Sequence, residues 1–307
     1  MAKFRDSSVH DFGFAGPPST PPVQDAAATG TDRSIGDIIR ETRNLSADQV
    51  EKILAHQRQT GVRFGEAAIA LGLASPNDVM FALSQQFHYP YAQEDRGNVS
   101  SELVALVQPF ARQSEVFRAI RSQVIMRVFQ PGEPRRAIAV ISPNSGDGKT
   151  FFSANLAVSL AQLGGRTLLV DADMRGPRQH ELFGLDNGVG LSHILSGRAQ
   201  TRSIQQVSGV PNLFVLPVGI TPPNPLELVA RPALALLMRA LVSKFDHVVV
   251  DTPAAIYGSD FSVIAARCGA ALLVARKNAA RVGDLQELTT MLDGSPAKLT
   301  GVVMNEF

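Results

Sequence analysis

The sequence predicts an α/β domain with a doubly wound, mainly parallel sheet, preceded by a small all-helical module. From about residue 110 onward, short apolar runs rich in β-branched residues alternate with amphipathic stretches, which is typical of βαβ units. Residues 34–86 instead hold two similar segments of helical periodicity. We expect four parts: a disordered tail (1–32), the helical module (33–92), a linker (93–108) and the α/β domain (109–307).

Composition excludes several functional classes. The 307-residue chain has a net charge of +1, so we expect no nucleic-acid partner. The single cysteine, Cys268, excludes a disulfide framework and favours a reducing cytoplasm. No apolar run reaches the roughly 18 residues of a membrane-spanning helix, and the first residues lack the apolar core of a signal peptide. We therefore expect a cytoplasmic protein.

The helical module contains an internal repeat. Gly36 and Gly65 stand 29 residues apart at matching places, as do Ser46 and Ser75. Each of the two serines precedes an apolar stretch of helical period and is a favourable N-cap. Each copy therefore predicts a helix, a turn and a second helix, and two copies are fewer than a solenoid needs. The preceding tail, 1–32, is rich in proline and poor in large apolar residues, which predicts disorder.

A glycine-rich loop follows the first strand of the α/β domain, in the segment SPNSGDGKT (142–150). Its glycines let backbone N–H groups turn toward an anion, and the helix that follows presents its positive end there. Lys149 would add a cation, and Thr150 could bind Mg²⁺ through its hydroxyl. Pro143 stands where the strict motif has glycine, so the alternative is a glycine-rich turn with an incidental lysine. We predict nucleotide contacts from Ser145, Gly146, Asp147, Gly148, Lys149, Thr150 and Phe151.

Two later strands end in aspartates. LLVDAD places Asp171 and Asp173 at one strand end, and VVVD places Asp251 at another. The carboxyl ends of parallel strands meet at one edge of a sheet, where clustered carboxylates repel unless a cation lies between them. We predict Mg²⁺ at Thr150, Asp173 and Asp251, and catalytic roles for Lys149, Asp171 and Asp173. The alternatives are that Asp173 caps a turn and that Asp251 is a turn residue before Thr-Pro.

These three elements resemble the Walker A, A′ and B motifs of bacterial tyrosine kinases. The segment TPPNPLEL (221–228) is similar to a further motif of that family, and the resemblance covers about residues 110–307. It implies an ATP- and Mg²⁺-dependent protein tyrosine kinase that regulates exopolysaccharide polymerisation and export. It also implies a membrane-embedded chain-length determinant as partner, which would hold the protein at the inner membrane and supply an activating segment.

The same resemblance implies a ring-shaped homo-oligomer. Glu115, Arg118 and Arg121 match the family's E-x-x-R-x-x-R motif, and their spacing places them along one helical flank. A solvated helix face is the alternative interpretation. Partitioning and septum-site ATPases are a competing family, but the place of their signature lysine is taken by Asn144.

Two alternatives to a tyrosine kinase stay open. The chain lacks the tyrosine-rich C-terminal cluster usual in the family, and its only tyrosines are Tyr89, Tyr91 and Tyr257. Tyr89 and Tyr91 could accept phosphate or pack against the helical module, and Tyr257 could line the site. An ATPase that switches assembly without phosphorylating a protein would use the same site residues. A module that senses cyclic di-GMP is the third class.

That third class follows from the helical module, which resembles the N-terminal domain of type II secretion and pilus ATPases. Arg63, Gly65 and Gly72 match a half-motif that binds cyclic di-GMP in some members. The first copy carries Ser34 and Arg43 at the corresponding Arg and second Gly places, which argues against a complete ligand site. A module that docks a protein partner is the alternative.

Overall fold

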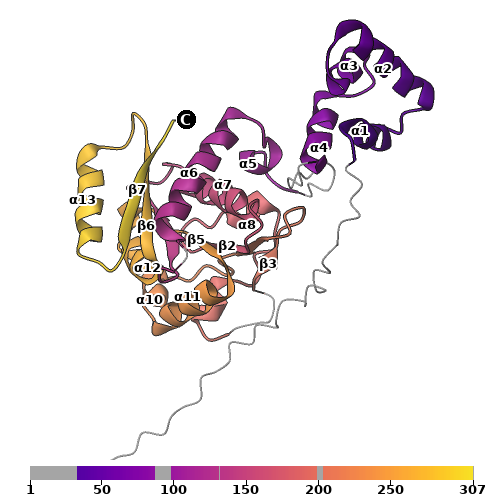
Figure 1. Ribbon diagram of the computed structural model, residues 1–307. Coiled ribbons are helices and arrows are strands. Elements are labelled where there is room, and N and C mark those ends of the chain that lie inside the picture. The colour runs from indigo at the N-terminus through magenta and orange to yellow at the C-terminus, as the bar shows by residue number, and fades with distance from the viewer. Residues whose placement is uncertain (1–32, 87–97, 131, 199–202, 307) are drawn as a thin grey trace, which may run out of the picture. The chain divides into compact units, whose positions relative to one another are not determined.

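The computed structural model describes residues 33–86, 98–130, 132–198 and 203–306. These residues fall into two compact units, one ending at residue 86 and the other beginning at residue 98 (Figure 1). The predicted tail and the tyrosines Tyr89 and Tyr91 lie outside the described residues. None of the helices in the described ranges combines the length and the apolar character needed to cross a membrane.

The first unit consists of four helices, which are α1 (Ile35–Arg43), α2 (Ala47–Thr60), α3 (Phe64–Ala70) and α4 (Pro76–Gln86). The predicted caps are confirmed, because Ser46 Oγ accepts a hydrogen bond from the Gln49 N–H and Ser75 Oγ accepts one from the Asp78 N–H. Ser34 caps α1 in the same way. Each copy of the repeat thus forms a helix, a turn and a second helix.

The two copies pack crosswise rather than side by side. Helix α1 packs against α4, and α2 packs against α3. The contact between α3 and α4 explains Gly65, because a Cβ at this position would lie 2.7 Å from Val79 Cγ1. An ion pair of 2.6 Å between Arg43 and Asp78 also joins α1 to α4. Of the residues that match the cyclic di-GMP motif, Gly65 therefore serves the packing of the unit itself. Arg43, which replaces the second glycine in the first copy, is paired within the unit.

The second unit is built on a seven-stranded sheet with the order β3-β4-β2-β5-β1-β6-β7. The strands are β1 (Ala137–Ile141), β2 (Thr167–Asp171), β3 (Gln205–Gln206), β4 (Leu213–Leu216), β5 (His247–Asp251), β6 (Gly269–Arg276) and β7 (Lys298–Asn305). All neighbours pair in parallel except β3 and β4. The apolar runs that predict the α/β domain coincide with the six parallel strands, whereas the two residues of β3 are too few to form a pattern.

Helices cover both faces of this sheet, which confirms the doubly wound fold. One face carries α5, α6 and α7, and the other carries α9 to α13 (Figure 1). The helices are α5 (Val104–Val107), α6 (Arg112–Val128), α7 (Lys149–Ala161), α8 (Gln179–Phe183), α9 (Leu191–Leu195), α10 (Pro225–Val229), α11 (Pro232–Lys244), α12 (Asp260–Cys268) and α13 (Val282–Asp293). A short 3₁₀ helix, η1 (Ala255–Tyr257), follows β5.

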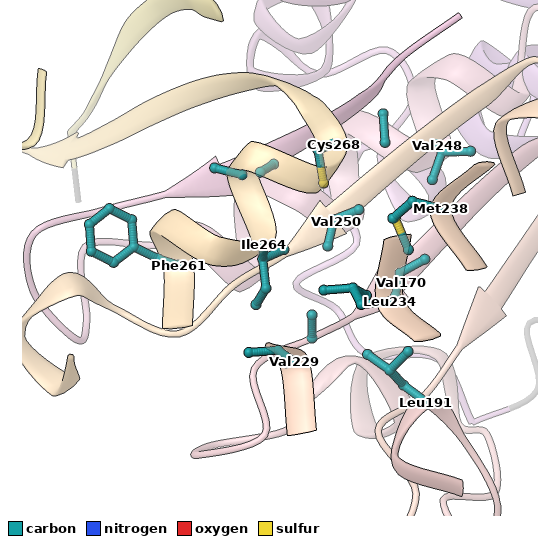
Figure 2. Packing of buried hydrophobic residues seen from close by; sticks show 14 of the residues in the cluster. Val170, Leu191, Val229, Leu234, Met238, Val248, Val250, Phe261, Ile264 and Cys268 are labelled. Atoms are coloured by element: carbon teal, nitrogen blue, oxygen red, sulfur yellow. The ribbon is translucent and has the colours of Figure 1, made fainter. Parts of the chain in front are cut away.

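Apolar side chains fill the space between the sheet and the second helical layer. Figure 2 shows Val248 and Val250 of β5 and Val170 of β2 beside Leu234 and Met238 of α11. Alternate residues of a strand point to the same face, so every second residue of β2 and β5 contributes to this core. The packing holds the strands in register, with Asp171 opposite Asp251 at the ends of β2 and β5.

Residues 98–108, which fall in the predicted linker, pack on α7. The fully buried Asn155 of α7 accepts a hydrogen bond from the Ala105 N–H and donates one to the Glu102 C=O, both of 2.9 Å. The Ser100 N–H also donates to the Leu182 C=O at 2.8 Å. This segment is thereby fixed to the helix that follows the glycine-rich loop.

Candidate functional site

The glycine-rich loop connects β1 to α7 and adopts an anion-binding conformation. Gly146 and Gly148 have φ angles of 83° and 96°, in the left-handed region that favours glycine. Gly148 is the N-cap of α7, and no side chain in the described residues caps this helix. Its first N–H groups can therefore bind a phosphate. The Asp147 side chain supports the loop, because its Oδ2 accepts a hydrogen bond from the Asn144 N–H at 2.8 Å.

A cavity of about 540 Å³ opens beside this loop. The loop and the start of α7 contribute Ser145, Gly146, Gly148, Lys149, Thr150 and Phe151 to its lining, and other segments contribute Glu102, Gln113, Asp173, Arg175, Gly176, Arg178 and Tyr257. The loop, the end of β2 and the segment after β5 thus meet at one hollow. The structure brings together all the predicted nucleotide contacts here except Asp147, whose side chain is buried in the loop.

Asp171 and Asp251 lie completely buried under this cavity, next to each other on β2 and β5. Asp171 Oδ2 accepts hydrogen bonds from the Arg178 and Gln179 N–H groups, at 3.1 and 3.0 Å. Asp251 Oδ2 accepts one from Gln179 Nε2 at 2.8 Å. Asp251 Oδ1 is buried and has no hydrogen-bond partner within the described ranges.

The two buried carboxylates have perturbed pKa values. Burial, and then the charge of Asp251, raises the pKa of Asp171 well above its ordinary value. Burial also raises the pKa of Asp251 to about 6, although the Lys149 charge and the hydrogen bond from Gln179 lower it. Two adjacent buried acids with raised pKa values mark a place where a cation would be stabilising.

Asp173 is the predicted carboxylate that reaches the cavity wall. Its Oδ1 accepts hydrogen bonds from the Arg175 and Gly176 N–H groups, at 3.1 and 3.0 Å, so it also caps a turn, as the alternative interpretation held. Its Oδ2 is the oxygen left for a ligand. Arg175, another wall residue, is held by an ion pair of 2.8 Å between its Nε and Oδ2 of the buried Asp260.

The donor set suits a hard cation that is bound together with a nucleotide. The orphaned Asp251 Oδ1, the Thr150 hydroxyl and Asp173 Oδ2 are all oxygen ligands, which Mg²⁺ prefers. Within the described residues, no three acidic, histidine or cysteine side chains are arranged to hold a metal alone. Mg²⁺ commonly binds through one or two carboxylates and the phosphates of its substrate, so this arrangement fits it.

Gln179 is a site residue that the sequence does not reveal. It is fully buried, and it contacts Asp171, Asp251 and the first turn of α7. A single glutamine at the start of a short helix belongs to no hydrophobic repeat and no spaced motif, so the sequence does not mark it as a site residue. Arg175 and Arg178, which also line the cavity, follow the predicted aspartates closely, and that proximity was the available signal. Tyr257 lines the cavity as well, which was one of its two expected roles.

The predicted assembly motif lies on α6, with its side chains engaged within the chain. Arg118 pairs with the largely exposed Glu115, and Arg121 donates to the Ser159 C=O of α7 at 2.8 Å. Val116 and Met126 of the same helix are half exposed. The flank is therefore partly bound to the domain and partly open.

Comparison with known proteins places the second unit in a family. Residues 138–307 match the model of the CobQ/CobB/MinD/ParA nucleotide binding domain. The chain is 37% identical over 194 residues to a putative tyrosine-protein kinase, EpsB, of Ralstonia solanacearum, a match covering 62% of this chain and 25% of the relative. It therefore spans about a quarter of that relative's length. No comparison bears out the likeness of the helical module to pilus ATPases.

Shorter relatives are matched over most of their length. A putative tyrosine-protein kinase, CapB, of Staphylococcus aureus is 34% identical over 200 residues, which cover 65% of this chain and 86% of CapB. The solved kinase domain of the Escherichia coli tyrosine kinase ETK superposes with a TM-score of 0.65 and 29% identity, over 70% of this chain and 83% of that domain. The chain therefore belongs to the CobQ/CobB/MinD/ParA nucleotide-binding family and, within it, to the bacterial tyrosine-protein kinases.

Proposed function

We propose that this protein is an ATP-dependent protein tyrosine kinase that regulates the polymerisation and export of an exopolysaccharide. The observation that carries the proposal is the convergence of Lys149, Thr150 and Asp173 on one cavity, above the buried pair Asp171 and Asp251. Family membership supports the same activity, since the relatives it rests on are named as putative tyrosine-protein kinases.

The residues have separate tasks in this proposal. The N–H groups of the glycine-rich loop and Lys149 bind the β- and γ-phosphates and offset the charge that develops during transfer. Thr150 and Asp251 would hold Mg²⁺, which when bound neutralises phosphate charge and orients the γ-phosphate, so that Asp173 Oδ2 stays available to the acceptor hydroxyl. Asp171 has both oxygens engaged by N–H groups, so it acts through the geometry of the site.

Asp173 is the carboxylate best placed to receive the proton of the acceptor hydroxyl. It lies at the cavity wall, and two N–H groups fix its Oδ1 while Oδ2 remains for the incoming tyrosine. In the transfer, the tyrosine oxygen bonds to the γ-phosphorus, the bond to the β–γ bridging oxygen breaks, and ADP leaves. The proton passes to Asp173.

The partner and assembly proposals rest on the family resemblance. We propose that a membrane-embedded chain-length determinant binds the protein at the inner membrane and activates it through a cytoplasmic segment. Ring assembly would use the α6 flank of Glu115, Arg118 and Arg121, with the half-exposed Val116 and Met126 beside it. Mixing the protein with that segment and measuring its mass in solution, with Arg118→Ala as a comparison, tests both ideas.

The helical unit is proposed as a docking module for a protein rather than a complete cyclic di-GMP site. Gly65 is required by the contact with Val79, and Arg43 is paired with Asp78, so neither needs a ligand to explain it. Calorimetry of cyclic di-GMP on the whole protein separates the two possibilities, because a docking module gives no heat of binding.

The kinase proposal is tested by incubating the protein and the partner's cytoplasmic segment with Mg-ATP. Mass spectrometry should find phosphate on tyrosine in the wild-type sample, and Lys149→Met should abolish it. Accumulation of ADP without any phosphotyrosine would remove the kinase and leave an ATPase that switches assembly. Absence of both products would remove the nucleotide chemistry altogether.

A further inference from the structure

Gln179 connects the ends of β2 and β5 to the first turn of α7. Its Nε2 lies 2.8 Å from Asp251 Oδ2, 2.9 Å from Ser153 Oγ and 3.1 Å from the Thr150 C=O. Its backbone N–H donates to Asp171 Oδ2 at 3.0 Å. One residue therefore binds both buried carboxylates and the first turn of the helix that follows the phosphate loop.

Folding alone does not favour a glutamine at this position. Gln179 has none of its surface exposed, and its Oε1 has no hydrogen-bond partner in the part of the chain that the structure describes. A buried acceptor without a donor is unfavourable, whereas an apolar side chain of the same volume would avoid that cost. The amide is explained by the hydrogen bond that it donates to Asp251.

The two carboxylates need to be held by donors. Asp171 and Asp251 are opposite each other on adjacent strands, so their negative charges repel and each side chain would otherwise rotate away. Residue 179 supplies one N–H to the Oδ2 atom of each carboxylate. With Oδ2 of Asp251 engaged in this way, its partnerless Oδ1 is the atom left for a cation or a cation-bound water.

We infer that Gln179 is a positioning residue that fixes the Asp251 carboxylate for the divalent cation bound with the nucleotide. The inference rests on the proposed nucleotide site and assigns a role within it. It separates two contributions to nucleotide binding: the loop and Lys149 bind the phosphates directly, while Gln179 contributes through the Asp251 carboxylate that receives the cation.

Calorimetry of ADP binding, with excess Mg²⁺ and with EDTA, tests this separation. In the wild-type protein Mg²⁺ should tighten ADP binding. Gln179→Met keeps the side-chain volume. Its affinity for ADP in EDTA should stay within about twofold of the wild-type value, while the factor by which Mg²⁺ tightens ADP binding (the Mg²⁺ gain) should fall at least tenfold. Gln179→Asn keeps the amide but is too short to reach Asp251, so the same loss is expected from a second variant.

Asn155→Leu is the matched control. Asn155 is also a fully buried amide with three hydrogen bonds, but these go to backbone groups of residues 102, 105 and 151 and to no carboxylate. This variant should lower the melting temperature and keep the full Mg²⁺ gain.

The outcomes are distinguishable. A full Mg²⁺ gain in both Gln179 variants overturns the positioning role and leaves the nucleotide site intact. An equal loss of ADP affinity with and without Mg²⁺ also overturns it, because Gln179 would then only shape the loop. A wild-type protein that binds no ADP under either condition removes the proposed function, and the inference with it.

Discussion

Replacing Asp251 by asparagine should make the nucleotide-free protein more stable at neutral pH. Burial raises the pKa of this carboxyl group from 3.8 to about 6, so its ionised form destabilises the folded state. A shift of about two pKa units corresponds to about 3 kcal/mol of folding free energy. Asparagine has a similar shape and keeps an oxygen that can accept the hydrogen bond from Gln179 Nε2.

The effect should depend on pH in a defined direction. Below about pH 4 both the folded and the unfolded state carry a protonated Asp251, so wild type and variant should have equal stability. Between about pH 4 and pH 6 the unfolded state ionises first and the wild type loses stability. Above about pH 6 the variant should keep its full advantage, which is about 6–12 °C in melting temperature for a domain of this size.

Thermal unfolding in EDTA, followed by circular dichroism between pH 4 and pH 8, measures this difference. Asp260→Asn is the control, because Asp260 is an equally buried carboxylate that is paired with Arg175, and its loss should lower the melting temperature. Mg-ADP should then raise the melting temperature of the wild type more than that of Asp251→Asn, because the variant still binds ADP through the loop but has lost a ligand of the cation. A variant that is less stable than the wild type at pH 8, or an advantage independent of pH, would refute the reasoning.

Further predictions concern the phosphate loop, the helical unit and the core. Lys149→Met should weaken ADP binding about ten- to a hundredfold in calorimetry, since a hydrogen bond to a charged group contributes about 1.5–3 kcal/mol; unchanged affinity would place the phosphates elsewhere. Gly65→Ala should destabilise the helical unit by about 1–3 kcal/mol, because its Cβ would lie 2.7 Å from Val79. The matched Gly36→Ala, whose Cβ meets its nearest atom at 3.6 Å, should be neutral or stabilising in chemical denaturation. Burial raises the pKa of the Cys268 thiol to about 12, so iodoacetamide should alkylate it only after unfolding, as mass spectrometry can follow.

The sequence predicts the framework of the fold because that framework is periodic. The six parallel strands are apolar runs of distinct composition, and the repeat in the helical unit is visible from paired serines such as Ser46 and Ser75. The two-residue β3 and the packing of residues 98–108 on Asn155 depend on contacts between distant segments, which no local pattern encodes.

The candidate site was predictable only in part for the same reason. The loop motif and the strand-end aspartates locate the cavity, and Lys149, Thr150 and Asp173 line it. Their spacing could not tell that Asp171 is sealed beneath the cavity, or that Gln179 bridges it to Asp251. Burial and side-chain direction arise from the register of β2 against β5, and that register is a property of the folded sheet.

The crosswise packing of the helical unit has a consequence for its origin. Each half-repeat finds the partner for its apolar side in the other half, α1 with α4 and α2 with α3. A single helix–turn–helix half would expose the apolar face of both its helices to water, so it would be stable only when paired with a second copy. Tandem duplication of such a hairpin would account for the internal repeat, and the packing predicts that cutting the unit between its halves yields fragments that reassociate when mixed.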